Sequence, residues 1–198
     1  MKKQQLIQEL KKQKFPERIL KAFEKVPREL FISPELKQYA YQNQPLPIGK
    51  GQTISQPYTI AFMLSLLDVR DNQSTLEIGS GSGYVLALLS ELSQNSCIVG
   101  VERIKELAEN SQEKLKNYKN VKVIHRSALE NLGNEKYDRI LASASFKELP
   151  QEIINSNLKI GGIAVFPIQN SIAVIRKTQS ENKINYYPGF RFVPIVKE

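Results

Sequence analysis

The chain has 198 residues, with 28 Lys and Arg against 20 Asp and Glu, a net charge of +8 and a single cysteine. This length suits one α/β domain with an adequate core, and no stretch is long enough to act as a linker between two domains. The apolar runs are short and interrupted by charges, so we expect no signal peptide, no membrane-spanning helix and a cytoplasmic protein. Cys97 cannot form an internal disulfide, and its place in an apolar strand predicts a buried structural residue.

Two short amphipathic helices are predicted at the start of the chain. Their apolar residues recur at helical spacing: Leu6, Ile7 and Leu10 in the first, and Ile19, Leu20, Phe23 and Val26 in the second. Residues 1–25 hold eight Lys or Arg and three Glu, so most of the net charge lies here. Because no exposed aromatic residues are interleaved with these cations, we interpret them as a solvated helix face rather than a nucleic-acid-binding patch.

The next segment, residues 26–51, is irregular but is expected to be ordered. Four prolines interrupt it, and its many apolar and aromatic residues argue against disorder. A long ordered loop ahead of a core fold is often functional. A helix is then predicted over residues 58–69.

Ser55, just before that helix, allows two interpretations. As an N-cap two residues ahead of Pro57, it would bind the first free amides of the helix and need no further role. As a site residue at a helix N-terminus, its hydroxyl and the adjoining N–H groups would suit a carboxylate. The interpretations are compatible, and the spacing alone favours the cap.

The stretch LEIGSGSG, residues 76–83, predicts a strand, a tight turn and a helix. Gly79, Gly81 and Gly83 alternate with serines, and glycine there allows backbone angles closed to other residues and lets a ligand lie against the main chain. Tyr84 stands where the dinucleotide fingerprint needs its last glycine. A ligand without a pyrophosphate therefore fits this turn better.

A second apolar run, residues 97–101, ends in Glu102. A carboxylate at the carboxyl end of such a strand can accept hydrogen bonds from both ribose hydroxyls of a nucleoside. With Glu77 before the glycine turn and Glu102 after it, the pattern indicates an S-adenosylmethionine site rather than a structural turn.

Strands and helices alternate over the rest of the chain. We predict strands at 75–79, 97–102, 121–125, 137–143, 160–167, 171–177 and 183–193, and helices at 83–93, 104–117 and 150–157. This order is typical of a mostly parallel seven-stranded sheet with helices on both faces and an antiparallel C-terminal hairpin. Since ligands bind such sheets at the carboxyl ends of the strands, Gly83, Glu102, Ser127 and Ala142 should gather at one edge.

His125 is the only histidine and ends the third of these strands. A histidine in this position is more often packed or solvated than catalytic. With no second histidine and no cysteine cluster, the sequence predicts no metal site and no Ser–His–Asp triad.

Several stretches together resemble the protein-L-isoaspartate (D-aspartate) O-methyltransferases. They are RELFISPELKQYAYQNQPLPIGKGQTISQP (28–57), LEIGSGSGY (76–84), VGVERIKEL (99–107), YDRILASAS (137–145), LKIGGIAVFPI (158–168) and RFVPI (191–195). The glycine motif is common to class I methyltransferases, whereas LPIG-x-GQTISQP is specific to this family. The resemblance covers nearly the whole chain.

The resemblance implies a Rossmann-like class I methyltransferase fold, with the last strands in the family's swapped order, and transfer of a methyl group from S-adenosylmethionine to the side carboxylate of L-isoaspartyl or D-aspartyl residues in damaged proteins. Residues 1–57 would form a helical and loop segment covering the substrate, and residues 58–198 the cofactor-binding core of the same domain. The implied catalytic residue is Ser55. The implied cofactor-binding residues are Gln52, Thr53, Ile54, Glu77, Gly79, Ser80, Gly81, Ser82, Gly83, Glu102, Arg103, Ser127 and Ala128. The implied substrate-binding residues are Asn43, Ile54, Ser55 and Val193.

Two positions depart from the family pattern. The family usually has Asp at the position of Asn43, and Gly-Asp-Gly in place of Arg126-Ser127-Ala128. The second Asp is the family's partner for the adenine amino group, and Ser127 stands in its place.

The chemistry explains why so few ionisable groups are needed. A carboxylate nucleophile, with an unperturbed pKa near 4, is already ionised at neutral pH, and a thioether leaving group departs without an acid. Alignment of the reacting atoms is then the main contribution. The alternatives are a divergent methyltransferase acting on RNA or a small molecule, and a degenerate relative that binds without turnover. We expect isoaspartyl proteins as partners, no membrane or nucleic-acid partner, and a monomer.

Overall fold

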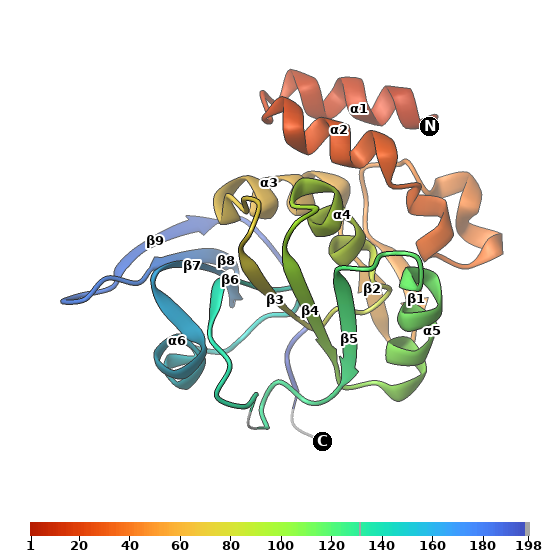
Figure 1. The fold of residues 1–198 in the computed structure, drawn as a ribbon. Coiled ribbons are helices and arrows are strands. Elements are labelled where there is room, and N and C mark those ends of the chain that lie inside the picture. Colours follow the sequence, from red (N-terminus) through yellow and green to blue (C-terminus); the bar gives the residue numbers. More distant parts are fainter. Residues whose placement is uncertain (131, 197–198) are drawn as a thin grey trace.

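The computed structural model describes residues 1–130 and 132–196, and Figure 1 shows their arrangement. The N-terminal part contains helices α1 (Lys3–Lys12) and α2 (Glu17–Lys25), the 3-10 helices η1 (Arg28–Phe31) and η2 (Pro34–Tyr39), the antiparallel strands β1 (Leu46–Gly49) and β2 (Gln52–Ile54), and helix α3 (Pro57–Leu67). The expected helices are present. The segment predicted to be irregular also contains a short β-hairpin, β1–β2.

The core is a seven-stranded sheet, as predicted. Its strands are β3 (Ser74–Ile78), β4 (Cys97–Glu102), β5 (Val121–His125), β6 (Tyr137–Ala142), β7 (Leu158–Ile168), β8 (Ser171–Arg176) and β9 (Lys183–Pro188), in the order β5-β4-β3-β6-β7-β8-β9. The strands from β5 to β7 pair in parallel, and β8 and β9 add antiparallel. The parallel strands therefore end at one edge, where the arrowheads of β3, β4 and β5 point in Figure 1.

Both faces of the central strands β3, β4 and β6 are buried. Helices α3 and α4 (Tyr84–Leu92) contact one face, together with α5 (Lys105–Leu115), and α6 (Gln151–Asn157) packs on β7. Alternate strand residues serve the two faces: Ile98 belongs to the cluster that contains α3 and α4, and Val99 belongs to the cluster that contains Ile154 of α6. Such strands are apolar throughout because neither side meets water.

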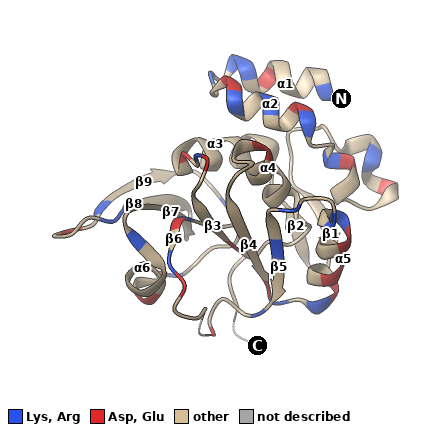
Figure 2. Cartoon of the chain, in the orientation of Figure 1, with Lys and Arg blue, Asp and Glu red and all other residues tan. Residues whose placement is uncertain are grey.

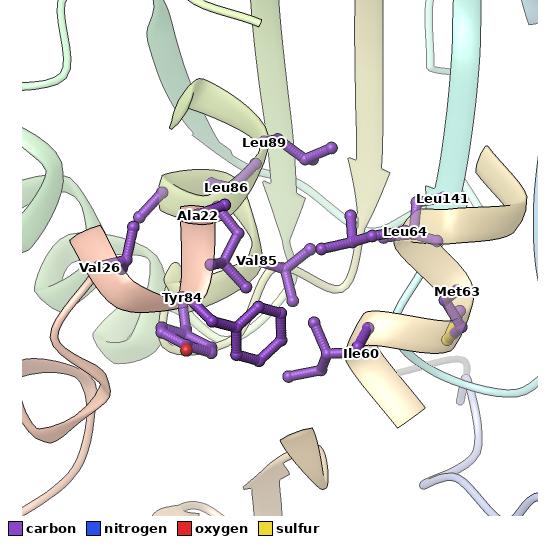
Figure 3. Packing of buried hydrophobic residues seen from close by; sticks show 14 of the residues in the cluster. Ala22, Val26, Ile60, Met63, Leu64, Tyr84, Val85, Leu86, Leu89 and Leu141 are labelled. Carbon is purple, nitrogen blue, oxygen red and sulfur yellow. The ribbon is translucent and has the colours of Figure 1, made fainter. Parts of the chain in front are cut away.

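Helices α1 and α2 form an outer layer over α3 and α4 (Figure 1). Ala22 and Val26 of this layer belong to the same buried cluster as Ile60 and Leu64 of α3 and Tyr84 and Val85 of α4 (Figure 3). Lys and Arg recur along both helices (Figure 2), and most of these residues are exposed. No helix among the described residues is long and apolar enough to cross a bilayer.

Two predictions about strands were wrong. Strand β9 ends at Pro188 rather than 193, because the amides of Gly189 and Phe190 turn back to the carbonyl of Asn170. Residues 190–196 then run to the carboxyl edge of the sheet, where Val193 and Ile195 bond to the backbone of Ser145. Cys97 is exposed instead of buried, since it is the first residue of β4 and lies at the rim of the sheet.

Candidate functional site

Two adjoining pockets lie at the carboxyl edge of the parallel strands. The first pocket is lined by the glycine turn after β3, by the ends of β4 and β6, and by the β1–β2 hairpin. The second pocket is lined by the start of α3 and by residues 187–194. Thr53, Ser55, Ser143, Val193 and Pro194 line both. These residues therefore mark the boundary across which two ligands could meet.

The glycine turn has the backbone that its spacing predicts. Gly79, Gly81 and Gly83 have φ values of +74°, +50° and +84°, in the left-handed region that favours glycine. A Cβ on Gly83 would lie 2.8 Å from Leu115 of α5, and one on Gly81 would lie 3.1 Å from Ile48 of the hairpin. Gly83 therefore serves helix packing and lies outside the pocket lining, whereas Gly79 and Gly81 line the first pocket.

Glu102, at the end of β4, organises the wall of the first pocket. Its carboxylate is buried, and its two oxygens accept hydrogen bonds from the amides of Gly81 and Ile104, each at 2.9 Å. A carboxylate has about four lone-pair sites, so each oxygen can accept a further bond. Glu102 thus has free acceptor capacity where it lines the first pocket.

Glu77, at the end of β3, is fully buried beneath the glycine turn. Its Oε1 accepts a 2.6 Å hydrogen bond from the hydroxyl of Ser143, and its Oε2 has no partner among the described residues. Burial raises the pKa of Glu77 to about 8, although the bond from Ser143 acts in the opposite direction. The buried hydroxyl of Ser80 also lacks a partner within that part of the chain. Ligands and ordered waters are the usual partners of such atoms in a pocket lining.

The β1–β2 hairpin closes the first pocket from the N-terminal side. It contributes Ile48, Gln52, Thr53 and Ile54 to the lining. Its tip is joined to the first turn of α5 by an ion pair of 2.6 Å between Lys50 and Glu106. Only residues 45, 48 and 52–56 of the first 57 line either pocket, so the basic helices α1 and α2 lie away from both.

Ser55 is not the N-cap of α3. The N-cap position is Gln56, which makes no side-chain capping bond. The capping interaction comes from Asn43, whose side-chain oxygen accepts a 2.9 Å hydrogen bond from the amide of Tyr58, while its amide group donates to Glu9 at 2.8 Å. The capping interpretation of Ser55 was therefore wrong, because a loop residue fifteen positions from Tyr58 already fills that role.

Aromatic side chains form part of the lining of the second pocket. Its walls include Tyr58, Phe62, Tyr187, Phe190 and Phe192. Phe62 stacks on Phe190 with ring centroids 5.1 Å apart and meets Tyr187 edge-on at 5.5 Å. Among the described lining residues the only charged one is Arg191. This surface suits an extended, partly apolar chain more than a compact polar ligand.

Ser127 lines the first pocket beside Arg126 and Ala128. Its side chain is buried, and its hydroxyl accepts a 3.3 Å hydrogen bond from the amide of Leu129. The hydroxyl can still donate, but it carries no charge.

The structure brings most of the predicted site residues together. Those in the first pocket are Gln52, Thr53, Ile54, Ser55, Glu77, Gly79, Ser80, Gly81, Ser82, Glu102, Arg103, Ser127, Ala128 and Val193. Asn43 and Gly83 lie outside both linings, as does His125, whose ring bonds to the carbonyl of Arg103. Sequence reasoning missed Ile48, Tyr84, Ser143, Ala144 and Ile195. Of these, Ser143 could have been found, since it directly follows a strand that ends at the same edge.

The described residues contain no cluster of three or more His, Cys, Asp or Glu that could hold a metal ion. The site offers two buried carboxyl groups, a turn with glycine backbone, and the side chains of Ser55 and Ser143 on the boundary of the two pockets. This arrangement can hold a polar ligand in the first pocket. It can also orient a group of a second ligand, bound in the second pocket, that needs no proton removed before it reacts.

The comparisons with known proteins agree with each other. The family model described as protein-L-isoaspartate(D-aspartate) O-methyltransferase matches residues 1–198. A protein-L-isoaspartate O-methyltransferase of Petrotoga mobilis is 41% identical over 191 residues, covering 92% of this chain and 88% of the relative. The protein of the same name from Ignicoccus hospitalis is 37% identical over an aligned length of 208 residues, covering 100% and 98%.

The fold is also found in a crystal structure from Plasmodium falciparum, described as a protein-L-isoaspartate O-methyltransferase in complex with S-adenosyl-L-homocysteine. It superposes with a TM-score of 0.85 at 24% identity and covers 98% of each chain.

Proposed function

The chain belongs to the protein-L-isoaspartate(D-aspartate) O-methyltransferase family, and from this we infer that it transfers a methyl group from S-adenosylmethionine to the side carboxylate of isoaspartyl residues in damaged proteins. The single observation that carries the site assignment is the boundary shared by the two pockets. Ser55 lies on that boundary, with the orphaned Oε2 of Glu77 on one side and the aromatic pocket on the other.

The residues of the first pocket fit the cofactor. The unpartnered atoms of Glu77 and Ser80 are polar groups that a ligand with hydrogen-bonding functions would satisfy. The free acceptor capacity of Glu102 suits ribose hydroxyls. Gly81 lines the first pocket with a left-handed backbone and no side chain, so a cofactor can lie against the main chain at the turn. When bound, S-adenosylmethionine supplies the electrophilic methyl group.

The protein has to position the substrate rather than activate it. A side carboxylate with an ordinary pKa near 4 is ionised at neutral pH, so no side chain need remove a proton. We propose that the hydroxyl of Ser55 donates a hydrogen bond to this carboxylate and holds it at the boundary of the pockets. Alignment of reacting atoms can contribute roughly 7–11 kcal/mol to a barrier, which makes orientation a sufficient task for the site.

The second pocket is proposed to hold the damaged peptide in an extended conformation. Its aromatic walls offer broad apolar contact without a deep side-chain pocket, and Val193 lies at its junction with the first pocket. Recognition through the backbone tolerates varied flanking side chains, which suits an enzyme that acts on many damaged proteins.

A second candidate is a relative that binds the cofactor without turnover. The observation that favours it is Ser127, a neutral residue at the position where the resemblance implies an adenine-binding Asp. An RNA or small-molecule methyltransferase is less well supported, because the basic residues of α1 and α2 lie away from both pockets. We place the reaction in the cytoplasm, with a monomer as the acting unit.

The test is incubation of the protein with labelled S-adenosylmethionine and, in separate samples, RNA or one of two peptides that differ only in carrying isoaspartate or aspartate. The isoaspartyl peptide should gain a base-labile methyl ester and the aspartyl peptide should not. Equal labelling of both peptides, or labelling of RNA alone, would overturn the repair function. Cofactor binding without labelling of any substrate would establish the second candidate.

A further inference from the structure

Arg28 is a buried arginine without a carboxylate partner in the described part of the chain. Its side chain is fully buried, and its guanidinium carbon lies 5.3 Å from the centroid of the Tyr84 ring. Burial lowers the pKa of Arg28 to about 10, so the group remains charged at neutral pH. A buried cation whose charge no carboxylate balances lowers stability, because it loses its hydration.

The same guanidinium holds the two ends of the β1–β2 hairpin. Its Nη2 donates a 2.9 Å hydrogen bond to the carbonyl of Ser55 and lies 3.4 Å from the carbonyl of Gln44. Gln44 precedes β1 and Ser55 follows β2. Leu46 of β1 and Ile54 of β2 are paired at this end of the hairpin. One nitrogen therefore lies between the two chain segments at the open end of the hairpin.

The tip of the hairpin is held by weaker interactions. There Lys50 pairs with Glu106, but both side chains are at least half exposed, and exposed ion pairs contribute little to stability. Ile48 adds a packing contact against Gly81. The hydrogen bond from Arg28 is the side-chain bond that holds the carbonyl of Ser55 within the described residues.

Stability alone does not account for this arginine. Its Nε and Nη1 atoms have no hydrogen-bond partner within residues 1–130 and 132–196. Replacing a buried charged group by an apolar side chain of similar volume is often neutral or stabilising. A buried arginine with two donor atoms that make no hydrogen bond contributes little to stability. Its presence therefore points to a role in the site rather than in the fold.

We propose that Arg28 is a positioning residue for methyl transfer: by holding the carbonyl of Ser55, it fixes the serine hydroxyl at the boundary of the two pockets. Arg28 lines neither pocket, so it acts through Ser55 and touches neither cofactor nor substrate. This inference rests on the proposed function of Ser55. It adds a residue of the 3-10 helix η1, 27 positions away in the chain, to the machinery of the site.

The test compares Arg28→Met with Arg18→Met. Arg18 is a matched control because it also donates to a backbone carbonyl, that of Val69, and lies in neither pocket lining. We expect Arg28→Met to keep or raise the Tm and to bind S-adenosylhomocysteine as the wild type does. Its kcat for the isoaspartyl peptide should fall about tenfold or more, since small misplacements of reacting groups have large effects. Arg18→Met should leave kcat unchanged.

A second readout does not depend on activity. Hydrogen exchange of the amides of β1 and β2 should become at least about threefold faster in Arg28→Met, because the open end of the hairpin is released. The amides of α4 should exchange at the wild-type rate in the same sample. Arg18→Met should change neither region.

The outcomes separate this inference from the proposed function. If the wild-type protein fails to methylate the isoaspartyl peptide, the proposed function is contradicted. Hydrogen exchange of the β1 and β2 amides then still tests whether Arg28 restrains the hairpin. An Arg28→Met variant with wild-type exchange, or with kcat within about twofold of wild type, overturns the positioning role. Should Arg28→Met fail to fold, Arg28→Lys decides: it keeps the charge but loses the planar fork, so kcat should fall several-fold, and unchanged kcat overturns the proposal.

Discussion

The amide of Gly81 donates a 2.9 Å hydrogen bond to Oε2 of Glu102, which lies 21 residues later in the chain. The other oxygen of Glu102 accepts a hydrogen bond from the amide of Ile104, the N-cap residue of α5. One carboxylate therefore holds the glycine turn after β3 and the start of the helix after β4 in a fixed relation. The wall of the first pocket is organised by the protein itself.

Glu102→Gln is expected to weaken binding of S-adenosylhomocysteine about tenfold or more. The amide keeps one acceptor oxygen but turns an N–H₂ group toward a backbone N–H, and loss of a hydrogen bond to a charged group costs roughly 1.5–3 kcal/mol. Titration calorimetry measures the change. Glu109→Gln, an exposed residue of α5, is the control and should bind normally. Wild-type affinity in Glu102→Gln would contradict the role assigned to this carboxylate.

Glu77→Gln is expected to stabilise the protein without cofactor at alkaline pH. Burial raises the pKa of Glu77 from 4.5 to about 8. The folded chain then binds more protons than the unfolded chain between these values, so the free energy of unfolding falls as the pH rises from 4.5 to about 8. Above that range the wild type carries the full penalty, on the order of a few kcal/mol.

Urea unfolding of both proteins at about pH 5 and about pH 8.5 tests this linkage. The gain from Glu77→Gln should be larger at the higher pH. Glu152→Gln removes an exposed carboxylate of α6 and serves as the control. A gain that is the same at both pH values would show that the buried carboxylate does not titrate as described.

The core of the site could be predicted from local patterns. Alternate glycines after an apolar run require left-handed backbone, and Gly79 and Gly81 have it. The rule that parallel strands end at one edge placed Glu102 and Ser127 together, because that arrangement follows from the alternation of strands and helices.

Contacts between distant segments could not be predicted in the same way. Asn43 caps α3 across fifteen residues, and Ser143 bonds to Glu77 across 66. Such pairs form only when the packed core brings the segments together. Strand β1 was missed because it contains Pro47, and proline is rare inside strands except at edges such as this two-stranded hairpin.

Ser127→Asp is expected to tighten binding of S-adenosylhomocysteine by about fivefold. The carboxylate would accept a charge-assisted hydrogen bond from the adenine amino group where the serine offers a neutral acceptor, a difference of roughly 1 kcal/mol. Calorimetry of the single variant measures this gain. The choice between isoaspartyl and aspartyl peptide should not change.

The neighbouring Arg126, which lines the same pocket, could pair with the new carboxylate and reduce the gain. Arg126→Gly combined with Ser127→Asp removes that competition and should bind at least as tightly as Ser127→Asp alone. If both variants bind the cofactor no better than wild type, another part of the 126–130 segment holds the adenine.

Ser55→Ala and Asn43→Ala are expected to separate catalysis from capping. The hydroxyl of Ser55 makes no hydrogen bond within the described residues, and Asn43 provides the cap of α3. Ser55→Ala should therefore leave the Tm and the affinity for S-adenosylhomocysteine unchanged. Its kcat should fall about tenfold to a hundredfold, as expected when one hydrogen bond to the substrate carboxylate is lost.

Asn43→Ala should show the opposite pattern. Loss of a cap costs about 1 kcal/mol, which lowers the Tm by roughly 2–4 °C in a chain of this size. Its kcat should stay within about threefold of wild type, because Asn43 lies outside both pocket linings and supports Ser55 only through the start of α3. Thermal unfolding and steady-state kinetics of the two variants, measured together, decide the assignment. A Ser55→Ala variant that unfolds earlier but turns over normally would show that the serine is structural, and a large loss of kcat in Asn43→Ala would place the loop before β1 in the substrate site.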